Sequence, residues 1–555
     1  MKKIILLIFF TLLLPKTTLG QYTLQDTTEL NSYNSIPKEQ VFIHFNDNLL
    51  LSGEYLYYKF HCLDSKKRTP SEISKIGYVA LLGKDGKLIF QHKIKLVDAR
   101  GQGDFFIPAD IETGHYKLIG FTQWMRNEGE RSFFIADLAI VNPYQELPKI
   151  IDESSSSKVL TLTHSRSDSL LGFSISEDKT PSFQIQLPQR TFGKRRLVKF
   201  DIHEITEQGF SNLSISVRKK DSVKIPFQKK NAVALETNAI SEKKRELKLD
   251  DSIYLPELRG ELISGRIISK TSKQPAKNEN IGLSIAGDNG LTKVSRSNKK
   301  GAFYFNLDIG HRNNQIIFDL LGNNKNDVEF FLDSSTINPY SFDFKEMAIS
   351  PNLNPLFEQR SIYNQIENAF FEQKTNSTIA SEYPKLAYKD FQEVYDLDDY
   401  TRFPTLQETI VEIIEDVLIK KRKDEYIIRV RQNGKFFIDS DDTPLILIDN
   451  VLIQDASQLV NYGVKKMQRI HISRSEFYIG PKKYQGIFSV ETKDGDYSKS
   501  IPSEKSFLFE VSGPIAMKKY YEQDYASRSL KNTQHNADFR QQLLWLPDIK
   551  IDKTR

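Results

Sequence analysis

The stretch from 444 to 492 constrains the fold of this chain more than any other part of the sequence. An apolar run at 445–448 leads into an Asp-Asn pair, and a second apolar run follows. This order predicts a buried strand, a tight turn and a second strand. A helix-like segment at 455–462 and an alternating segment at 486–492 come next. We therefore expect a small domain in which strands and a helix pack together.

The same segments resemble the plug domain of TonB-dependent outer-membrane receptors. The strand and turn at 445–450, the strand at 468–474, the turn at 478–480 and the strand at 486–492 stand in the family's order. The resemblance implies a plug-like domain over 426–500. About sixty residues follow this stretch, whereas a transmembrane barrel needs many strands of roughly ten residues. We therefore expect no transmembrane barrel.

Two residues depart from the plug pattern. Asn450 stands where the family has glycine, and His471 stands where it has an acidic residue. Because asparagine tolerates the left-handed backbone of a tight turn, the fold expectation is unchanged. Asp449, Asn450, His471 and Arg474 are predicted to lie exposed at turns or strand ends. They are the candidate partner-binding residues.

The first twenty residues predict export. Lys2 and Lys3 precede an apolar core at 4–14, and small residues at 18–20 offer a cleavage site. This is the pattern of a signal peptide over 1–20, and the core is short for the alternative, a membrane anchor. No later run reaches membrane length. We therefore expect a periplasmic or outer-membrane-associated protein whose mature chain has no transmembrane segment.

The charge balance argues against a nucleic-acid partner. The chain has 77 Lys and Arg against 72 Asp and Glu, a net charge of +5. Residues 1–20 hold three lysines and no acid, so the mature chain carries +2. A dedicated nucleic-acid binder is expected to be far more basic.

Short, evenly spaced strands over 38–145 predict a β-sandwich. They include 41–45, 55–60, 76–82, 88–96 and 114–121, and a Gly-Lys-Asp-Gly turn separates the third from the fourth. The 53–54 turn and the runs 103–105, 114–116 and 122–127 resemble the macroglobulin-like domain of alpha-2-macroglobulin relatives. That family traps proteases through a Cys-Gly-Glu-Gln thioester.

The single cysteine does not fit that thioester. Cys62 is followed by Leu63 and Asp64, so covalent trapping is excluded and the resemblance implies the scaffold alone. Cys62 is predicted to be a small core residue rather than a nucleophile. Trp124 is likewise predicted to be a core residue rather than part of a ligand site.

Four further segments complete the predicted organisation. Alternating runs over 146–250 predict a second sandwich with a linker, and 501–555 is a C-terminal tail. Residues 256–335 resemble the carboxypeptidase regulatory-like sandwich, through a strand at 262–268, a proline turn and a Gly-Ala-Phe-Tyr-Phe strand; no zinc motif accompanies it.

Residues 351–425 predict a helical connector. Apolar residues recur at three- and four-residue steps from 353 to 370, and we expect this face to pack on a neighbouring domain rather than on a partner. Thr405 and Glu408 form a predicted capping box that begins a second helix.

Motifs for catalysis and metal binding are weak. Asp396, Asp398 and Asp399, or the group at 439–442, offer carboxylates for calcium, but neither follows the template of a calcium loop. His203 and Glu204 lack the second histidine of a zinc helix. No nucleophile elbow and no phosphate loop occurs. We expect no cofactor and no metal.

Together these features predict a mostly β, multi-domain protein of tandem sandwiches followed by a plug-like domain. The chain resembles Bacteroidota envelope proteins that combine macroglobulin-like, carboxypeptidase regulatory-like and plug-like domains. We expect a non-enzymatic binding or accessory component of an outer-membrane complex, with an outer-membrane β-barrel protein as partner. A hydrolase acting on peptide or glycan is the first alternative, which would need a cleft with convergent acid and base groups. A passive structural stalk is the second.

Overall fold

The structure is a computed structural model in which strands dominate. It describes residues 21–148, 159–164, 183–189, 191–204, 212–225, 246–287, 290–307, 315–322, 327–337, 342–379, 387–423, 425–433, 443–501, 506–523, 525 and 537–550. Strands in these ranges form small open sheets of two to five members. This confirms the predicted mostly β, multi-domain sandwich class. No helix within the described ranges is long and apolar enough to cross a membrane.

The first sandwich packs a three-stranded sheet on a five-stranded one. The smaller sheet has the order β2 (Glu39–Phe45), β4 (Tyr55–Asp64), β7 (Arg100–Phe106). The larger has the order β3 (Leu49–Leu51), β9 (Phe134–Val141), β8 (Gly114–Phe121), β5 (Ile76–Leu82), β6 (Leu88–Lys95).

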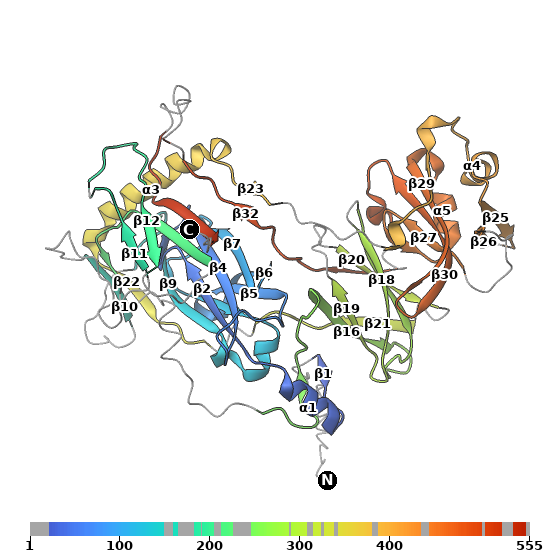
Figure 1. Ribbon diagram of the computed structural model, residues 1–555, viewed down its shortest axis with the longest axis horizontal. Coiled ribbons are helices and arrows are strands. Elements are labelled where there is room, and N and C mark those ends of the chain that lie inside the picture. The colour runs from blue at the N-terminus through green and yellow to red at the C-terminus, as the bar shows by residue number, and fades with distance from the viewer. Residues whose placement is uncertain are drawn as a thin grey trace, which may run out of the picture.

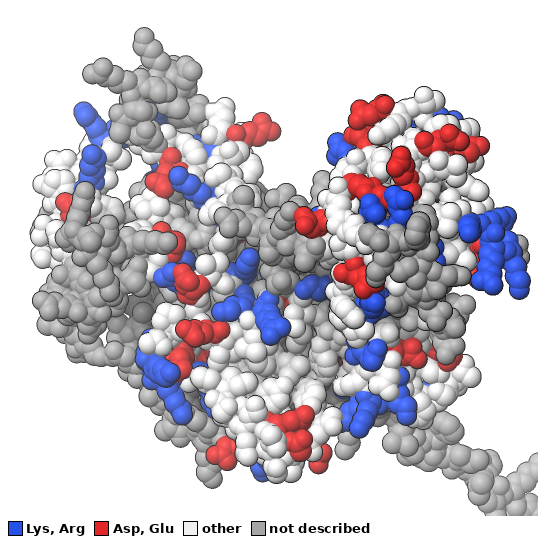
Figure 2. Space-filling view, turned by 45° about the vertical axis from the view of Figure 1, so that its right-hand side comes forward, with Lys and Arg blue, Asp and Glu red and all other residues white. Residues whose placement is uncertain are grey.

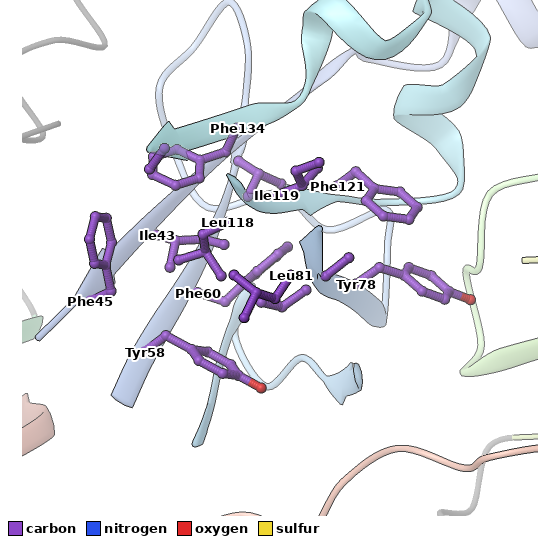
Figure 3. Packing of buried hydrophobic residues seen from close by; sticks show 14 of the residues in the cluster. Ile43, Phe45, Tyr58, Phe60, Tyr78, Leu81, Leu118, Ile119, Phe121 and Phe134 are labelled. Atoms are coloured by element: carbon purple, nitrogen blue, oxygen red, sulfur yellow. The ribbon is translucent and has the colours of Figure 1, made fainter. Parts of the chain in front are cut away.

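The core of this sandwich consists of apolar side chains, which alternate along β2 and occupy almost every position of β5. Ile43, Phe60, Leu118 and Phe121 meet between the sheets (Figure 3) and are fully buried. Burying each such side chain contributes about 1.5–3 kcal/mol. Cys62 is a free, buried member of the core, and burial raises the pKa of its thiol, which confirms its prediction as a core residue.

The N-terminal segment covers one end of the first sandwich. β1 (Tyr22–Thr23) pairs with β15 (Ser252–Ile253), and α1 (Thr27–Ser35) is capped by the Asp26 carboxylate. Trp124 is buried in a small apolar cluster beside this segment, and its Nε1 donates to the carbonyl oxygen of Pro37 at 3.0 Å. Trp124 is therefore the core residue that the sequence predicts.

The next domain is a second complete sandwich around four phenylalanines. One sheet has the order β19 (Ala302–Leu307), β16 (Glu261–Ser269), β21 (Val328–Leu332). The other has the order β18 (Leu291–Arg296), β17 (Asn280–Ile285), β20 (Gln315–Leu321), β31 (Phe507–Glu510). The rings of Phe303, Phe305, Phe318 and Phe330 contact one another between the sheets. We call this unit the middle sandwich.

A mixed sheet with two helices forms the second lobe in Figure 1. Its strand order is β24 (Glu393–Asp396), β29 (Met467–Ile479), β30 (Lys482–Thr492), β27 (Leu445–Ile448), β28 (Val451–Ile453). The hairpin β25 (Val417–Arg422) and β26 (Glu425–Val430) lies beside it with α4 (Leu406–Ile413) and α5 (Ala456–Tyr462). We call this unit the mixed-sheet lobe.

Local signals in the mixed-sheet lobe were predicted well. Strand, turn, strand, helix and two long strands occur in the expected order from 444 to 492. Thr405 and Glu408 form the reciprocal hydrogen bonds of the predicted capping box, at 3.1 Å each. These features depend on neighbours close in sequence, which is why the sequence contains them.

The described strands of residues 146–250, where the sequence predicts a second sandwich, pair with several distant parts of the chain. β10 (Val159–His164) pairs with β14 (Val223–Lys224) and with β22 (Glu346–Ile349). β11 (Phe183–Gln186) and β12 (Asp201–Glu204) form a separate pair, and β13 (Asn212–Arg218) joins β33 (Gln542–Lys550). The described strands of this range therefore lie in three small sheets. Alternation reveals which face of a strand is buried but not which strand lies beside it.

Helix α3 (Asn354–Ala369) packs on the first sandwich, which confirms that expectation (Figure 1). The contacting face differs from the predicted apolar stripe. Phe357, Arg360, Ser361 and Asn364 are buried, whereas Ile362 is 55% exposed. The buried face of α3 thus includes Arg360, which bonds to Glu54 of the sandwich.

The C-terminal tail is not a separate appendage. After β31 completes the middle sandwich, Ile515 forms a bridge to β6 of the first sandwich. β32 (Lys518–Lys519) then pairs with β23 (Ser377–Thr378), and β33 pairs with β13 next to β4. In Figure 1 the dark red tail runs from beside β20 of the middle sandwich to β32 at the first sandwich. The tail therefore connects all three units.

Candidate functional site

Asp449 has a structural role. The prediction that it is exposed is wrong, because its side chain is 5% exposed. Its carboxylate accepts hydrogen bonds from the Thr492 N–H at 2.8 Å, the Thr492 hydroxyl at 2.6 Å and the Tyr497 N–H at 3.1 Å. These bonds tie the turn after β27 to the end of β30.

Asn450 lies at a contact between two units. Asp449 and Asn450 have φ of 48° and 66°, so the turn has the left-handed backbone that asparagine was expected to tolerate. The Asn450 side-chain amide donates to the Gly287 carbonyl oxygen at 2.8 Å, and its own carbonyl accepts from the Thr292 hydroxyl at 2.7 Å. The turn is thereby docked on the middle sandwich.

We expect Asn450→Ala to destabilise this contact by about 1–2 kcal/mol, because it loses a hydrogen bond and places alanine in a left-handed conformation. Asn450→Gly keeps the backbone free to adopt that conformation. This variant should therefore destabilise the contact by less, about 1 kcal/mol. Hydrogen exchange of β17 and β18 measures both. Equal protection in the two variants and the unchanged protein would contradict the docking role.

His471 and Arg474 lie on β29 near β24 and are half-buried. The Phe391 ring lies 4.9 Å from the His471 ring, and Nε2 of His471 is 3.3 Å from a Glu491 carboxylate oxygen. Arg474 pairs with Asp416 at 2.9 Å and donates to a backbone carbonyl at 3.1 Å. Neither residue presents the exposed polar group that was predicted.

The predicted calcium ligands contact arginines. Asp396 accepts from Arg469 at 3.0 Å, and Asp398 pairs with Arg402. In the part of the chain that the structure describes, no three His, Cys, Asp or Glu side chains gather as a metal site would need. The second aspartate group, at 439–442, and the predicted signal peptide lie outside the described residues.

A pocket forms where three distant segments meet. Strand β4 of the first sandwich, the C-terminal part of α3 and the tail strand β33 surround a cavity of about 150 Å³. Gly53 helps to bring the segments together: its φ is 87°, and its carbonyl oxygen accepts from the Asn368 amide at 3.0 Å. We call this cavity the tail pocket.

Aromatic side chains make much of the pocket wall. The Tyr57 ring stacks on the Trp545 ring, with centroids 5.9 Å apart and planes 26° from parallel. Tyr520 meets Tyr57 edge to face at 5.1 Å. Burial raises the pKa of the Tyr57 phenol, which therefore stays protonated. The aromatic residues that line the pocket are Tyr55, Tyr57, Phe371, Tyr520, Tyr521 and Trp545.

The carboxylate of Glu54 at the pocket floor is held by Arg360 of α3. Arg360 donates to both carboxylate oxygens, at 2.6 and 2.7 Å, and to the Leu49 carbonyl oxygen at 3.1 Å. Its third nitrogen pairs with Asp221 at 2.7 Å. Burial by itself would raise the pKa of the Glu54 carboxyl, but the charge and hydrogen bonds of Arg360 outweigh burial and lower it. Glu54 is therefore a fixed anion.

The other ionisable groups that line the pocket are also paired. Glu367 binds Lys374 at 2.5 Å, and Arg540 binds Asp538 at 2.8 Å. Arg218 pairs with Asp47. The lining side chains therefore bring little net charge to the cavity. Figure 2 shows that acidic and basic side chains also intermingle over one face of the surface.

Sequence reasoning did not predict the tail pocket. Tyr55 and Tyr57 share one face of a strand, as alternate residues must, and this was the local signal available. Trp545 lies almost five hundred residues away in sequence. Nothing in a single sequence places β33 beside β4.

No family model and no curated protein matches the chain. Among solved structures, the chain is similar to Salmonella alpha-2-macroglobulin reacted with methylamine, with 7% identity, a TM-score of 0.17, and coverage of 91% of this chain and 22% of that one. The native conformation of Escherichia coli alpha-2-macroglobulin is similar with 10% identity and a TM-score of 0.17, and the match covers 90% of this chain and 22% of that one. A mutant beta-glucosidase from Listeria innocua in complex with laminaribiose is similar with 10% identity and a TM-score of 0.14, and the match covers 19% of this chain and 16% of that one.

Bacterial alpha-2-macroglobulins thus occur among the structural neighbours. The chain spans less than a quarter of the length of these proteins. At such TM-scores the similarity carries no argument about family or activity.

Proposed function

We propose that this chain is an exported, non-enzymatic binding component of the cell envelope that works within an outer-membrane complex. The observation that carries the proposal is the tail pocket. It is lined by aromatic rings, and each of its charged groups is already paired. Such a wall can bind a ligand.

A hydrolase would need a different wall. General acid and base catalysis requires groups that gain and lose a proton near the working pH. The acids among the described lining residues are Glu54 and Glu367. Arg360 holds the first as an anion, and Lys374 binds the second at 2.5 Å. This pairing favours binding over hydrolysis.

The partner would meet the mixed-sheet lobe on the side away from the middle sandwich. The edge strand β28 is covered, because the Leu452 N–H donates to the Ser284 hydroxyl at 3.0 Å. The opposite edge strand is β24. Val394 on β24 and Val411 on α4 are 54% and 69% exposed. We propose these two exposed valines as contacts for an outer-membrane β-barrel protein.

A gentle-detergent pull-down of the tagged full chain from its native envelope tests the proposal. We expect a stoichiometric β-barrel protein with the unchanged chain and a large loss with Val394→Glu and Val411→Glu combined. The matched control, Leu258→Glu, alters a residue of the middle sandwich that is 52% exposed and should change nothing. Recovery of the chain without any membrane protein or envelope polymer, or peptide or glycan cleavage by the purified chain, would contradict it.

A further inference from the structure

We infer that the tail pocket binds one neutral sugar ring of an envelope glycan. This inference rests on the proposed function and adds the class of ligand to it. It follows from three properties of the pocket: its size, its aromatic wall and its neutralised charges. Each of them restricts the ligand independently.

The size of the pocket limits the ligand to one ring. An apolar cavity of 150 Å³ in another protein holds benzene, a single six-membered ring. The tail pocket has about this volume. Sites for larger organic ligands measure roughly 300–1,000 Å³. One pyranose unit of a longer chain therefore fits, with the rest of that chain outside.

The wall offers ring faces to the ligand. An aromatic face carries partial negative charge, and the C–H groups on one side of a pyranose carry partial positive charge, so the two surfaces attract each other. Phe371 at the pocket is 47% exposed, although large apolar side chains are usually buried. Tyr57, Tyr520 and Trp545 pack on one another, and Trp545 and Tyr520 are only 3% and 6% exposed, so these rings support the wall. The exposed Phe371 ring is the face that can receive the flat apolar side of a sugar.

The charges of the wall are balanced, so a strongly charged ligand gains little there. Glu54 and Glu367 have Arg360 and Lys374 as partners, and a second ion would compete with these short pairs. Amide side chains provide the remaining polar groups. Amides and sugar hydroxyls both donate and accept hydrogen bonds. Several of these amides already bond within the chain, as Asn368 does to Gly53 and Asn364 to Glu54, so their remaining donors and acceptors are what a sugar can use. The lining amides are Asn46, Asn364, Asn368, Asn376, Gln541 and Gln542.

Two polar atoms on β33 are enclosed by the protein itself. Trp545 is 3% exposed, and its Nε1 donor has no hydrogen-bond acceptor in the described part of the chain. Oε1 of Gln542 is a buried acceptor without a donor there. Both side chains line the tail pocket. Because these two atoms are sealed from solvent, a ligand in the pocket contacts other atoms of the two side chains.

Trp545 also provides the readout. The chain has two tryptophans, so Trp124→Phe leaves Trp545 as the sole indole fluorophore. The full-length variant is titrated with maltotriose, cellotriose and N,N′,N″-triacetylchitotriose, and with tri-alanine as a peptide probe. We expect at least one saccharide to change Trp545 emission in a saturable way and tri-alanine to leave it unchanged.

Phe371→Ala in the same background should weaken saccharide binding at least tenfold, since it removes a ring face. Phe331→Ala is the matched control, because Phe331 is 48% exposed on β21 of the middle sandwich; it should leave affinity unchanged. Equal affinity in the Phe371 and Phe331 variants would overturn the assignment to this pocket.

The outcomes separate this inference from the proposed function. No saccharide response up to millimolar concentration, or a response to tri-alanine alone, overturns the sugar inference and leaves a binding role intact. Cleavage of a probe, followed by mass spectrometry, overturns the proposed function itself. Saturable binding with intact probes supports both.

Discussion

Replacing Arg360 with methionine is expected to destabilise the contact between α3 and the first sandwich by about 3–5 kcal/mol. The change leaves the buried Glu54 carboxylate without its bidentate partner and deprives Asp221 and the Leu49 carbonyl of a donor. An unpaired charge in a buried site costs far more than the pair contributes. Urea unfolding and hydrogen exchange of α3 and β3 measure the loss.

Two variants test the cause. Lys84→Met breaks an exposed ion pair with Glu346, which solvent screens, and should leave the urea midpoint almost unchanged. Arg360→Met combined with Glu54→Met removes both charges and should recover much of the lost stability. If the double variant were as unstable as the single one, packing around Arg360 would matter more than its charge.

Replacing Glu257 with glutamine is expected to stabilise the junction between the first and middle sandwiches above neutral pH. Glu257 is fully buried there. One of its oxygens accepts from the Tyr78 hydroxyl at 3.1 Å and the Leu262 N–H at 3.0 Å. The other has no partner among the described residues. Burial, with the neighbouring Glu261 charge, raises the pKa of this carboxyl to about 8.

The sign of the pH effect follows from that pKa. Below the ordinary value near 4.5 both the folded and the unfolded chain hold the proton, so no cost arises. From there to about pH 8 only the folded chain retains it, and its stability falls by about 1.4 kcal/mol per pH unit. Above about pH 8 the lost free energy of unfolding stays constant, on the order of 3–5 kcal/mol. Glutamine has no titrating proton. The urea midpoints of the unchanged chain and of Glu257→Gln should therefore be close at pH 5, and the midpoint of the variant should be higher at pH 8.5.

Glu261 provides the opposite control. Its buried carboxylate forms an ion pair with Lys93 across the same junction. Glu261→Gln leaves a buried ammonium without its anion and should lower the urea midpoint. A lower midpoint for Glu257→Gln at pH 8.5 would show that Glu257 contributes to the junction as an anion.

Several elements were predictable because the evidence for them is local. The bounds of β5 and β8 match the predicted 76–82 and 114–121, since each reads as a short apolar run between turn residues. Strand β9, with the sequence FIADLAIV, was not predicted. It lies between β3 and β8 in the middle of a sheet, where both faces can be buried and alternation weakens.

The candidate site was far less predictable. Asp449 and Asn450 were chosen because turn residues are usually exposed, yet the middle sandwich covers this turn. Arg360 was not singled out in the sequence, and only its contact with Glu54 makes it part of a buried face. Single residue types carry no record of what will pack over them.

By itself the sequence determined the mostly β class, many strand positions, the capping box at Thr405 and the left-handed turn at Asn450. Each depends on side chains within a few positions of one another. The tertiary structure alone decided that β31 completes the middle sandwich, that β33 joins β13, and that three segments enclose the tail pocket. Such pairings join residues hundreds of positions apart, and strand alternation specifies a buried face without naming its partner.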